Sequence, residues 1–125
     1  MNLVDSCGWL EYFADGENAE FFTIPLQDTK NLIVPSICIF EVFKKILQER
    51  DESSAFQAIV LMQQGYVVEL NTMLAIQSAK LSFEMKLPLA DSIIFATAKL
   101  YNATIWTQDE HFKDMDNVMF VGKRK

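Results

Sequence analysis

Short apolar runs rich in β-branched residues alternate with segments of helical periodicity along this chain of 125 residues. Five runs have the composition of buried strands: residues 2–4, 32–35, 66–70, 103–107 and 117–121. Strands that alternate with helices pair in parallel, because each helix carries the chain back to the edge where the previous strand began. The sequence therefore predicts an α/β fold with a central parallel sheet of four to five strands and helices on both faces.

Length and composition fit a single domain spanning residues 1–125. Apolar residues make up 50% of the chain and aromatic residues 12%, which is enough for one sizeable core. No apolar run approaches the roughly 20 residues that cross a bilayer. The N-terminus has no basic region followed by an apolar stretch. We expect a cytoplasmic protein that does not enter a membrane. Cys7 and Cys38 lie outside any metal-binding motif and are expected to be free thiols.

Periodicity and capping residues predict the helices between the strands. Ser36 is expected to cap a helix that runs to about Arg50, with Phe40, Phe43 and Leu47 on its buried face. A pair of helices between the first two strands carries many aromatic residues, and we expect most of these in the core. Any surplus would line a groove for a partner. These aromatic residues are Trp9, Tyr12, Phe13, Phe21 and Phe22.

Residues 87–96 place one carboxylate, Asp91, inside an apolar run. Pro88 breaks the preceding helical pattern, and apolar residues then recur at helical spacing, so Asp91 falls in the first turn of a new helix. An acid there is favoured by the positive end of the helix dipole. Asp91 can therefore be a simple N-cap or part of a functional site.

Three more acids lie beside apolar segments in separate parts of the chain. Asp5 and Asp109 directly follow predicted strands, and Glu41 lies in the second turn of the helix after residues 32–35. In parallel sheets the ligand crevice lies beyond the carboxyl ends of the strands, where the winding reverses. The topology therefore allows all four acids to converge at one end of the sheet.

Each of these three acids also has a purely structural interpretation. Asp5 can cap the helix that follows it. Glu41 can pair with Lys44 or Lys45 on the helix surface. Asp109 can be a turn residue.

Several carboxylates gathered in one place repel each other unless they are protonated or bind cations. Mg²⁺ prefers oxygen ligands, and one or two such ions can activate water and stabilise charge on a phosphodiester. The sequence has no phosphate-binding glycine loop and no nucleophile elbow. The single histidine, His111, gives little support to a catalytic triad, and we interpret it as a surface residue or a support to a ligand. The net charge of −6 disfavours extensive electrostatic binding of nucleic acid. Cations bound by the acids would make the site less negative and reduce this repulsion.

Four segments, in this order along the chain, resemble the PIN domain. Within that family the chain is most similar to the VapC-type toxin ribonucleases. The resemblance covers nearly the whole chain and implies a compact three-layer α/β/α sandwich with metal-dependent endoribonuclease activity on RNA. The segments are Val4-Asp5-Ser6-Cys7-Gly8-Trp9-Leu10, Phe40-Glu41-Val42, Leu89-Ala90-Asp91-Ser92-Ile93-Ile94 and Thr107-Gln108-Asp109-Glu110-His111-Phe112.

The resemblance also implies roles for individual residues and for partners. Ser6 and Thr107 would orient a carboxylate or water, and Asp114 or Asp116 would supply an additional acid. Cys7 stands where relatives commonly have a hydroxyl or small residue, a change expected to affect packing more than catalysis. A cognate antitoxin protein would lie in a groove beside the site, and the protein would form a homodimer. The implied ligands of Mg²⁺ or Mn²⁺, which would activate the attacking water, are Asp5, Glu41, Asp91 and Asp109.

Two other hypotheses compete with the nuclease. A non-catalytic PIN-like binding module would keep the fold and use its acids as caps, and the acidic composition motivates this alternative. A phosphoryl-accepting receiver-like domain would explain an acid after the first strand. That fold also needs an acceptor Asp after a later strand and a Lys after the last one, and neither is evident.

Overall fold

The computed structural model describes residues 1–123 and is built around a five-stranded sheet whose neighbouring strands are all parallel. The strand order is β3-β2-β1-β4-β5, so β1 is central and the winding reverses between β1 and β4. The predicted parallel sheet is confirmed, with the last three strands slightly shorter than predicted. The strands are β1 (Asn2–Val4), β2 (Leu32–Pro35), β3 (Tyr66–Val68), β4 (Thr104–Thr107) and β5 (Val118–Phe120).

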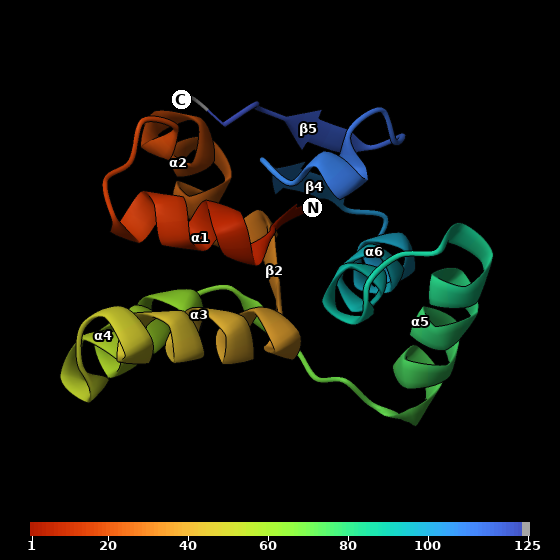
Figure 1. The fold of residues 1–125 in the computed structure, drawn as a ribbon, viewed down its shortest axis with the longest axis horizontal. Coiled ribbons are helices and arrows are strands. Elements are labelled where there is room, and N and C mark those ends of the chain that lie inside the picture. Colours follow the sequence, from red (N-terminus) through yellow and green to blue (C-terminus); the bar gives the residue numbers. More distant parts are fainter. Residues whose placement is uncertain (124–125) are drawn as a thin grey trace.

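Helices cover both faces of the sheet, as Figure 1 shows. Helices α1 and α2 pack against one face with α3 and α4 beside them, while α6 covers the other face and α5 packs on α6. This arrangement confirms the predicted three-layer α/β/α sandwich. Within residues 1–123 the α-helices are α1 (Ser6–Phe13), α2 (Ala19–Gln27), α3 (Ser36–Glu49), α4 (Glu52–Met62), α5 (Thr72–Met85) and α6 (Leu89–Tyr101), and the 3₁₀ turns are η1 (Thr29–Asn31) and η2 (Glu110–Phe112).

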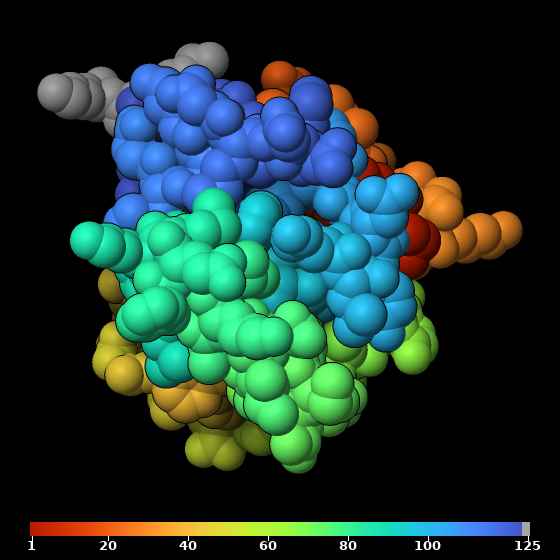
Figure 2. All heavy atoms as spheres, turned by 90° about the vertical axis from the view of Figure 1, so that its right-hand side faces the viewer, coloured from red at the N-terminus to blue at the C-terminus, as the bar shows by residue number. Residues whose placement is uncertain are grey.

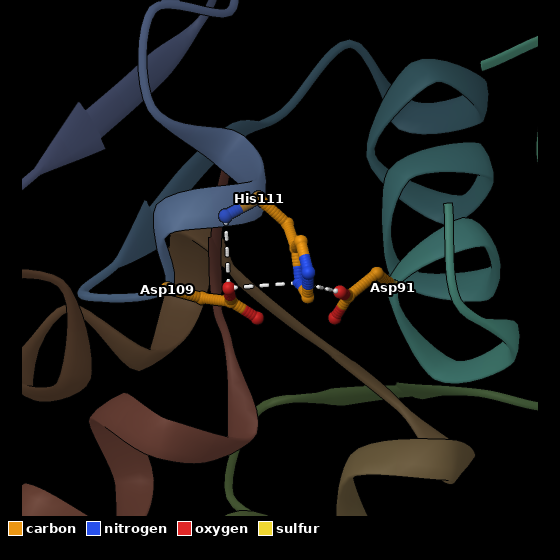
Figure 3. A group of neighbouring side chains, drawn as sticks. All are labelled: Asp91, Asp109 and His111. Atoms are coloured by element: carbon orange, nitrogen blue, oxygen red, sulfur yellow. Dashed lines mark hydrogen bonds and ion pairs between the residues drawn. The ribbon is translucent and has the colours of Figure 1, made fainter. Parts of the chain in front are cut away.

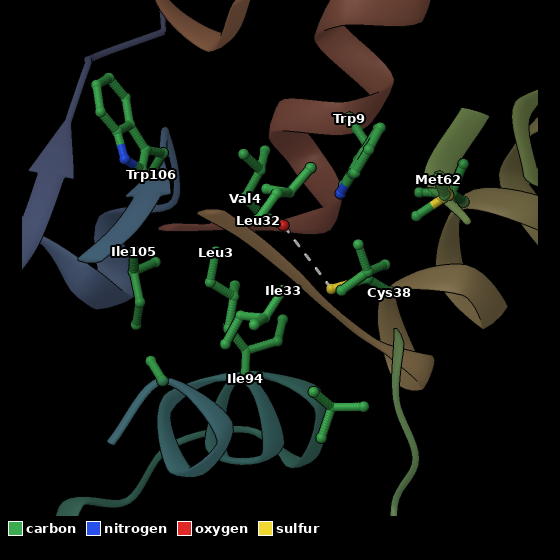
Figure 4. Close-up of a cluster of buried hydrophobic side chains, with 14 of the residues drawn as sticks. Leu3, Val4, Trp9, Leu32, Ile33, Cys38, Met62, Ile94, Ile105 and Trp106 are labelled. Atoms are coloured by element: carbon green, nitrogen blue, oxygen red, sulfur yellow. Dashed lines mark hydrogen bonds between the residues drawn. The ribbon is translucent and has the colours of Figure 1, made fainter. Parts of the chain in front are cut away.

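The core lies on both sides of the sheet because successive strand residues point to opposite faces. Figure 4 shows Leu3, Ile33 and Ile105 pointing toward α6, where Ile94 meets them, while Val4 points toward α1. All five side chains are buried. The central strands are thus apolar on both faces, as expected for a parallel sheet covered by helices.

The predicted buried face of α3 is wrong for Phe40 and Leu47, whereas Phe43 is partly buried and packs against the core as predicted. The helix buries Cys38, Val42 and Ile46, whereas the side chains of Phe40 and Leu47 are 60% and 45% exposed. Both stripes have helical spacing, so periodicity alone does not distinguish them. The sheet and the neighbouring helices select the stripe that carries the smaller residues.

The predicted N-cap of α3 is also wrong. Pro35, the last residue of β2, occupies the cap position and Ser36 is already helical. The Ser36 hydroxyl instead accepts a hydrogen bond from the backbone N–H of Leu70, at 3.3 Å. The serine therefore ties the segment after β3 to the start of α3, a long-range contact that the local sequence does not signal.

Figure 2 shows a face of the molecule on which α5 and α6 lie side by side, below the segment that leads from β4 to β5. A groove of about 460 Å³ on this face is lined by residues of both helices, including Ala79, Phe83 and Leu89. We call this surface the α5 face. No helix of residues 1–123 has the length and apolar character needed to span a membrane. The exposed apolar side chains of the α5 face are Leu70, Met73, Ile76, Phe83 and Leu89.

Gly8 lets α1 approach α2 and β1 closely. A Cβ atom at this position would lie 2.6 Å from a ring carbon of Phe22 and 2.6 Å from Cγ1 of Val4. Alanine gains up to about 1 kcal/mol in helix propensity over glycine, but overpacking a core costs about 1–3 kcal/mol. We expect Gly8→Ala to lower the midpoint of thermal unfolding by several degrees, measured by circular dichroism.

Gly122→Ala is the matched control for this substitution, because a Cβ atom there meets nothing within 4 Å. It should leave the unfolding midpoint nearly unchanged. A Gly8→Ala protein as stable as the wild type would show that α1 can shift away from Phe22 without loss.

Candidate metal and active site

Parallel pairing of β1 with β4 brings Asp5 next to Thr107. Val4 is in register with Trp106, and the backbone N–H of Asp5 donates to the Trp106 carbonyl at 3.0 Å. The Thr107 hydroxyl donates to Asp5 Oδ2 at 2.8 Å, and the Ser6 N–H donates to Asp5 Oδ1 at 2.7 Å. Asp5 is thus the N-cap of α1, and its carboxylate is fixed between two strand ends.

The same threonine positions Asp109. The Asp109 N–H donates to Thr107 Oγ1 at 2.9 Å, and Asp109 Oδ1 accepts from the N–H of His111 at 2.9 Å. Asp109 therefore caps the short turn η2. Phe112, the last residue of that turn, is fully buried and anchors it to the core.

Asp91 approaches Asp109 from the other side of the site. Pro88 occupies the cap position of α6, so Asp91 is the third helical residue and the N-cap interpretation does not hold. Its carboxylate is largely buried, and His111 Nδ1 lies 2.7 Å from Asp91 Oδ2 and 3.0 Å from Asp109 Oδ1. Figure 3 shows the imidazole between the two carboxylates. Over residues 1–123, these three side chains form the group whose ligand atoms are close enough to share one ion.

Glu41 reaches this end of the sheet through Ser6. The Ser6 hydroxyl donates to Glu41 Oε1 at 2.6 Å, joining the second turn of α3 to the start of α1. Lys45, one of the two proposed surface partners of Glu41, instead pairs with Glu49 at 3.1 Å. Glu41 is thus directed toward α1 and Asp5 by a hydrogen bond.

The carboxylates of the site raise each other's pKa values. Burial, the larger cause, raises the pKa of Asp5 from 3.8 to about 6, and the charge of Asp109 adds to this. Burial and the charges of Asp109 and Asp5 raise the pKa of Asp91 to about 6. The charges of Asp109 and Asp91 in turn raise the pKa of His111. The site is therefore a concentration of negative charge that favours a bound cation.

Among residues 1–123, the two acids considered as additional ligands are not part of the group of Asp91, Asp109 and His111. Asp114 is exposed and has a left-handed backbone with φ of 69°. Asp116 lines a cavity with Lys99 and Asn102, which precede β4, so it lies toward the opposite end of the sheet. In the part of the chain that the structure describes, neither acid joins the group formed by Asp91, Asp109 and His111.

Two features of the site have weak or absent sequence signals. His111 follows Asp109 by two residues, a spacing that allows an Asp-capped turn, but its contact with Asp91 depends on the tertiary fold. Asn18 Nδ2 donates to Gln108 Oε1 at 2.9 Å and to the Gly122 carbonyl at 3.2 Å, joining the α1–α2 connection to the loop that carries Asp109. No local pattern predicts such a contact.

Both cysteines are free thiols, as predicted. Cys7 Sγ donates to Asp5 Oδ2 at 3.4 Å, and burial raises the pKa of this thiol to about 12, so it stays protonated. The Cys7 thiol is thus a weak hydrogen-bond donor to Asp5.

A groove of about 530 Å³ runs from the site between α1 and the α3–α4 pair. Cys7 and Gln108 line the groove next to the acids, and Leu10 and Leu61 contribute apolar surface. Lys45 and Arg50 are among the charged residues that line it. The first two helices bury most of their aromatic surface, with Trp9 and Phe22 in the core, and Phe13 contributes to the groove.

The chain matches a known protein family and is similar in fold to several solved structures. A family model described as PIN domain matches residues 3–118. A toxin–antitoxin complex from Klebsiella pneumoniae contains a chain with a TM-score of 0.79 and 22% identity, covering 95% of this chain and 96% of that one. VapBC2 from Rickettsia felis, bound to promoter DNA, gives 0.72 and 12% identity, covering 97% of each chain. VapC20 from Mycobacterium tuberculosis, a toxin that cleaves the sarcin–ricin loop, has a TM-score of 0.69 and 12% identity, covering 83% of this chain and 85% of that one. No curated protein matches the chain by sequence.

The raised pKa of Asp5 predicts how the stability of the metal-free protein changes with pH. The pKa of Asp5 is about 6 in the folded protein and ordinarily 3.8, so the protonated carboxyl stabilises the fold. This stabilisation is complete below about pH 4 and is lost as the pH rises through about 6. In EDTA at pH 7, Asp5→Asn should raise the free energy of unfolding by up to about 3 kcal/mol. The gain is reduced by the loss of the hydrogen bond that Asp5 Oδ2 accepts from the Thr107 hydroxyl. Urea titrations at pH 4 and pH 7 measure this, and the gain should vanish at pH 4.

Asp51→Asn is the control with the opposite sign. Hydrogen bonds from Ser54 lower the pKa of Asp51, which caps α4 on the surface, so its ionised form stabilises the fold. This variant should lose stability at pH 7. An Asp5→Asn protein that is also less stable at pH 7 would contradict the unfavourable charge assigned to Asp5.

Proposed function

Since the chain belongs to the PIN domain family, whose model matches residues 3–118, we propose that it is a VapC-type, metal-dependent endoribonuclease that hydrolyses RNA phosphodiester bonds in the cytoplasm. Family membership supports nuclease chemistry. The similarity of fold to VapC20, which cleaves an RNA loop, supports RNA as the substrate class.

The observation that carries the proposal is the buried carboxylate of Asp91. It lies within the first turn of α6, where it caps nothing, and it shares His111 with Asp109 across the site. The N-terminus of α6 and His111 offset part of the cost of burying this carboxylate beside other acids, and a bound cation would offset the rest. A cation-binding function accounts for this arrangement.

The donor set fits a divalent ion. The oxygens of Asp91 and Asp109 lie close enough to share an ion, and Asp5 and Glu41 belong to the same negatively charged end of the sheet. A bound Mg²⁺ or Mn²⁺ supplies activation of the attacking water and stabilisation of the phosphate charge. Thr107 would hold Asp5 and Asp109 in place for this reaction, and Ser6 would orient Glu41.

The alternative, a non-catalytic binding module, explains part of the site. Asp5 and Asp109 do act as caps, as that hypothesis requires. It gives Asp91 no capping role and leaves only His111 and the N-terminus of α6 to compensate for its burial. Calorimetry with Mn²⁺ separates the two hypotheses. The nuclease should bind Mn²⁺ and lose this binding in Asp91→Asn, whereas a module that uses its acids only as caps should not bind Mn²⁺ at all.

We place the cognate antitoxin in the groove between α1 and the α3–α4 pair. The groove opens next to Cys7 and Gln108, so a segment lying in it would also reach the acids. Its apolar and charged lining suits an amphipathic peptide segment. The Klebsiella pneumoniae neighbour, which is part of a toxin–antitoxin complex, supports a partner of this class.

We also propose a homodimer, as the family resemblance implies. The exposed apolar side chains of the α5 face support it, because large exposed apolar residues around a groove are typical of interaction sites. This surface lies on a different pair of helices from the antitoxin groove, so the two contacts are compatible.

Loss of the Asp91 carboxylate should abolish cleavage. We expect purified protein to cut RNA with Mg²⁺ or Mn²⁺, to stop with EDTA, and to lose activity by at least about 100-fold in Asp91→Asn, because the ion loses a ligand. A gel assay on labelled RNA measures this. Asp28→Asn, a surface acid bonded to Asn31, is the control and should retain activity. Unchanged cleavage by Asp91→Asn would show that the site is assigned to the wrong residues.

A charge in the groove should weaken antitoxin binding without affecting cleavage. Leu61 lines the groove and is 46% exposed, so Leu61→Asp should raise the Kd for the proposed cognate antitoxin by about tenfold or more. Fluorescence anisotropy measures the Kd, and RNA cleavage should be unchanged. Val60→Asp, on the neighbouring exposed residue outside the groove lining, should bind normally. Equal Kd values for Leu61→Asp and wild type would place the antitoxin elsewhere.

A further inference from the structure

We infer that His111 is itself a ligand of the ion held by Asp91 and Asp109, and that this nitrogen donor makes the site favour a transition-metal dication such as Mn²⁺ over Mg²⁺. The inference rests on the proposed metal-dependent function and adds to it the identity of a further ligand and the class of ion. It differs from the expectation from sequence, in which His111 lies at the surface or supports another ligand.

The three side chains bring their ligand atoms close enough together to bind one ion. Adjacent ligands of an octahedral ion at about 2.1 Å lie about 3.0 Å from each other. His111 Nδ1 lies 2.7 Å from Asp91 Oδ2 and 3.0 Å from Asp109 Oδ1. All three ligand atoms lie within 4.8 Å of one another, with the imidazole between the two carboxylates (Figure 3), which is close enough for them to bind one ion.

The protein fixes His111 in this position independently of any ion. The backbone N–H of His111 donates to Asp109 Oδ1 at 2.9 Å, which forms the turn η2. The next residue, Phe112, is fully buried and anchors the turn. The imidazole is therefore attached to the same rigid turn as Asp109, as preorganised metal ligands usually are.

The site is open enough for an ion to enter. The His111 side chain is 54% exposed and that of Asp109 28% exposed, while Asp91 lies deeper at 12%. An ion approaching from solvent would meet the imidazole and Asp109 first and then Asp91. Metal ligands bind in their deprotonated form, so His111 would bind the ion through a ring nitrogen that carries no proton.

A nitrogen ligand changes the preference among ions. Mg²⁺ prefers oxygen ligands and retains its waters, whereas affinity for imidazole rises through the first-row transition metals. A site of carboxylates alone discriminates weakly between Mg²⁺ and Mn²⁺. With His111 as a ligand, Mn²⁺ should bind more tightly than Mg²⁺, and that preference should depend on the imidazole.

The direct test is pulsed electron paramagnetic resonance of Mn²⁺ bound to the wild-type protein. His111 is the single histidine in the sequence, so ¹⁴N coupling of the imidazole type in tag-free protein identifies this residue without any substitution. We expect this coupling in wild type and its loss in His111→Gln. Bound Mn²⁺ without ¹⁴N coupling in the wild type would overturn the inference.

Calorimetry supplies the second readout, the ratio of the Kd values for Mg²⁺ and Mn²⁺. His111→Gln and His111→Ala should each weaken Mn²⁺ binding by roughly tenfold or more and Mg²⁺ binding less, so the ratio falls. Glu110→Gln, on the neighbouring exposed residue, alters charge near the site without removing a ligand and should leave the ratio unchanged. If His111 is only a counter-ion that an entering metal displaces, the His111 variants will bind both ions equally well or more tightly, which would overturn the inference.

The same measurements separate this inference from the proposed function. Binding of Mn²⁺ that disappears in Asp91→Asn but shows no nitrogen coupling would retain the metal site and remove His111 from it. A wild-type protein that binds neither ion would overturn both the metal site and the role of His111. Thermal unfolding of each variant checks that the fold is retained.

Discussion

The arrangement of the site depends on the hydrogen bonds of the Thr107 hydroxyl. It donates to Asp5 at the end of β1 and accepts from the N–H of Asp109, so one buried side chain fixes two acids that are 104 residues apart in the sequence. This contact exists because β1 and β4 pair in parallel, with the winding of the sheet reversing between them. The carboxyl ends of these two strands form the crevice where ligands of such folds bind.

The site combines structural necessity with electrostatic strain. Asp5 and Asp109 cap the helical segments that follow them, so these acids contribute to the fold at the same time as they gather negative charge. Asp91 contributes no cap, and its burial beside Asp109 raises its pKa. His111 offsets part of this charge in the ion-free protein. The proposed cation would remove the remaining repulsion between these carboxylates.

The surfaces around the site separate the interactions that we propose. The groove between α1 and the α3–α4 pair begins beside the acids, so a partner bound there would cover the site. The α5 face lies on the helices that cover the other side of the sheet and presents apolar side chains away from that groove. Substrate access, inhibition and self-association can therefore be altered by different substitutions.

The sequence by itself determined the elements with strong local signals. Five short apolar runs became parallel strands, and the Pro88 break set Asp91 in the first turn of α6, because these features depend on neighbouring residues alone. Ordered acids after strands also indicated the end of the sheet where a site would form. Only the tertiary structure decided which stripe of α3 is buried, why Ser36 bonds Leu70, and how His111 lies between Asp91 and Asp109. Those outcomes depend on which elements pack together, and contacts between distant residues leave no pattern in the local sequence.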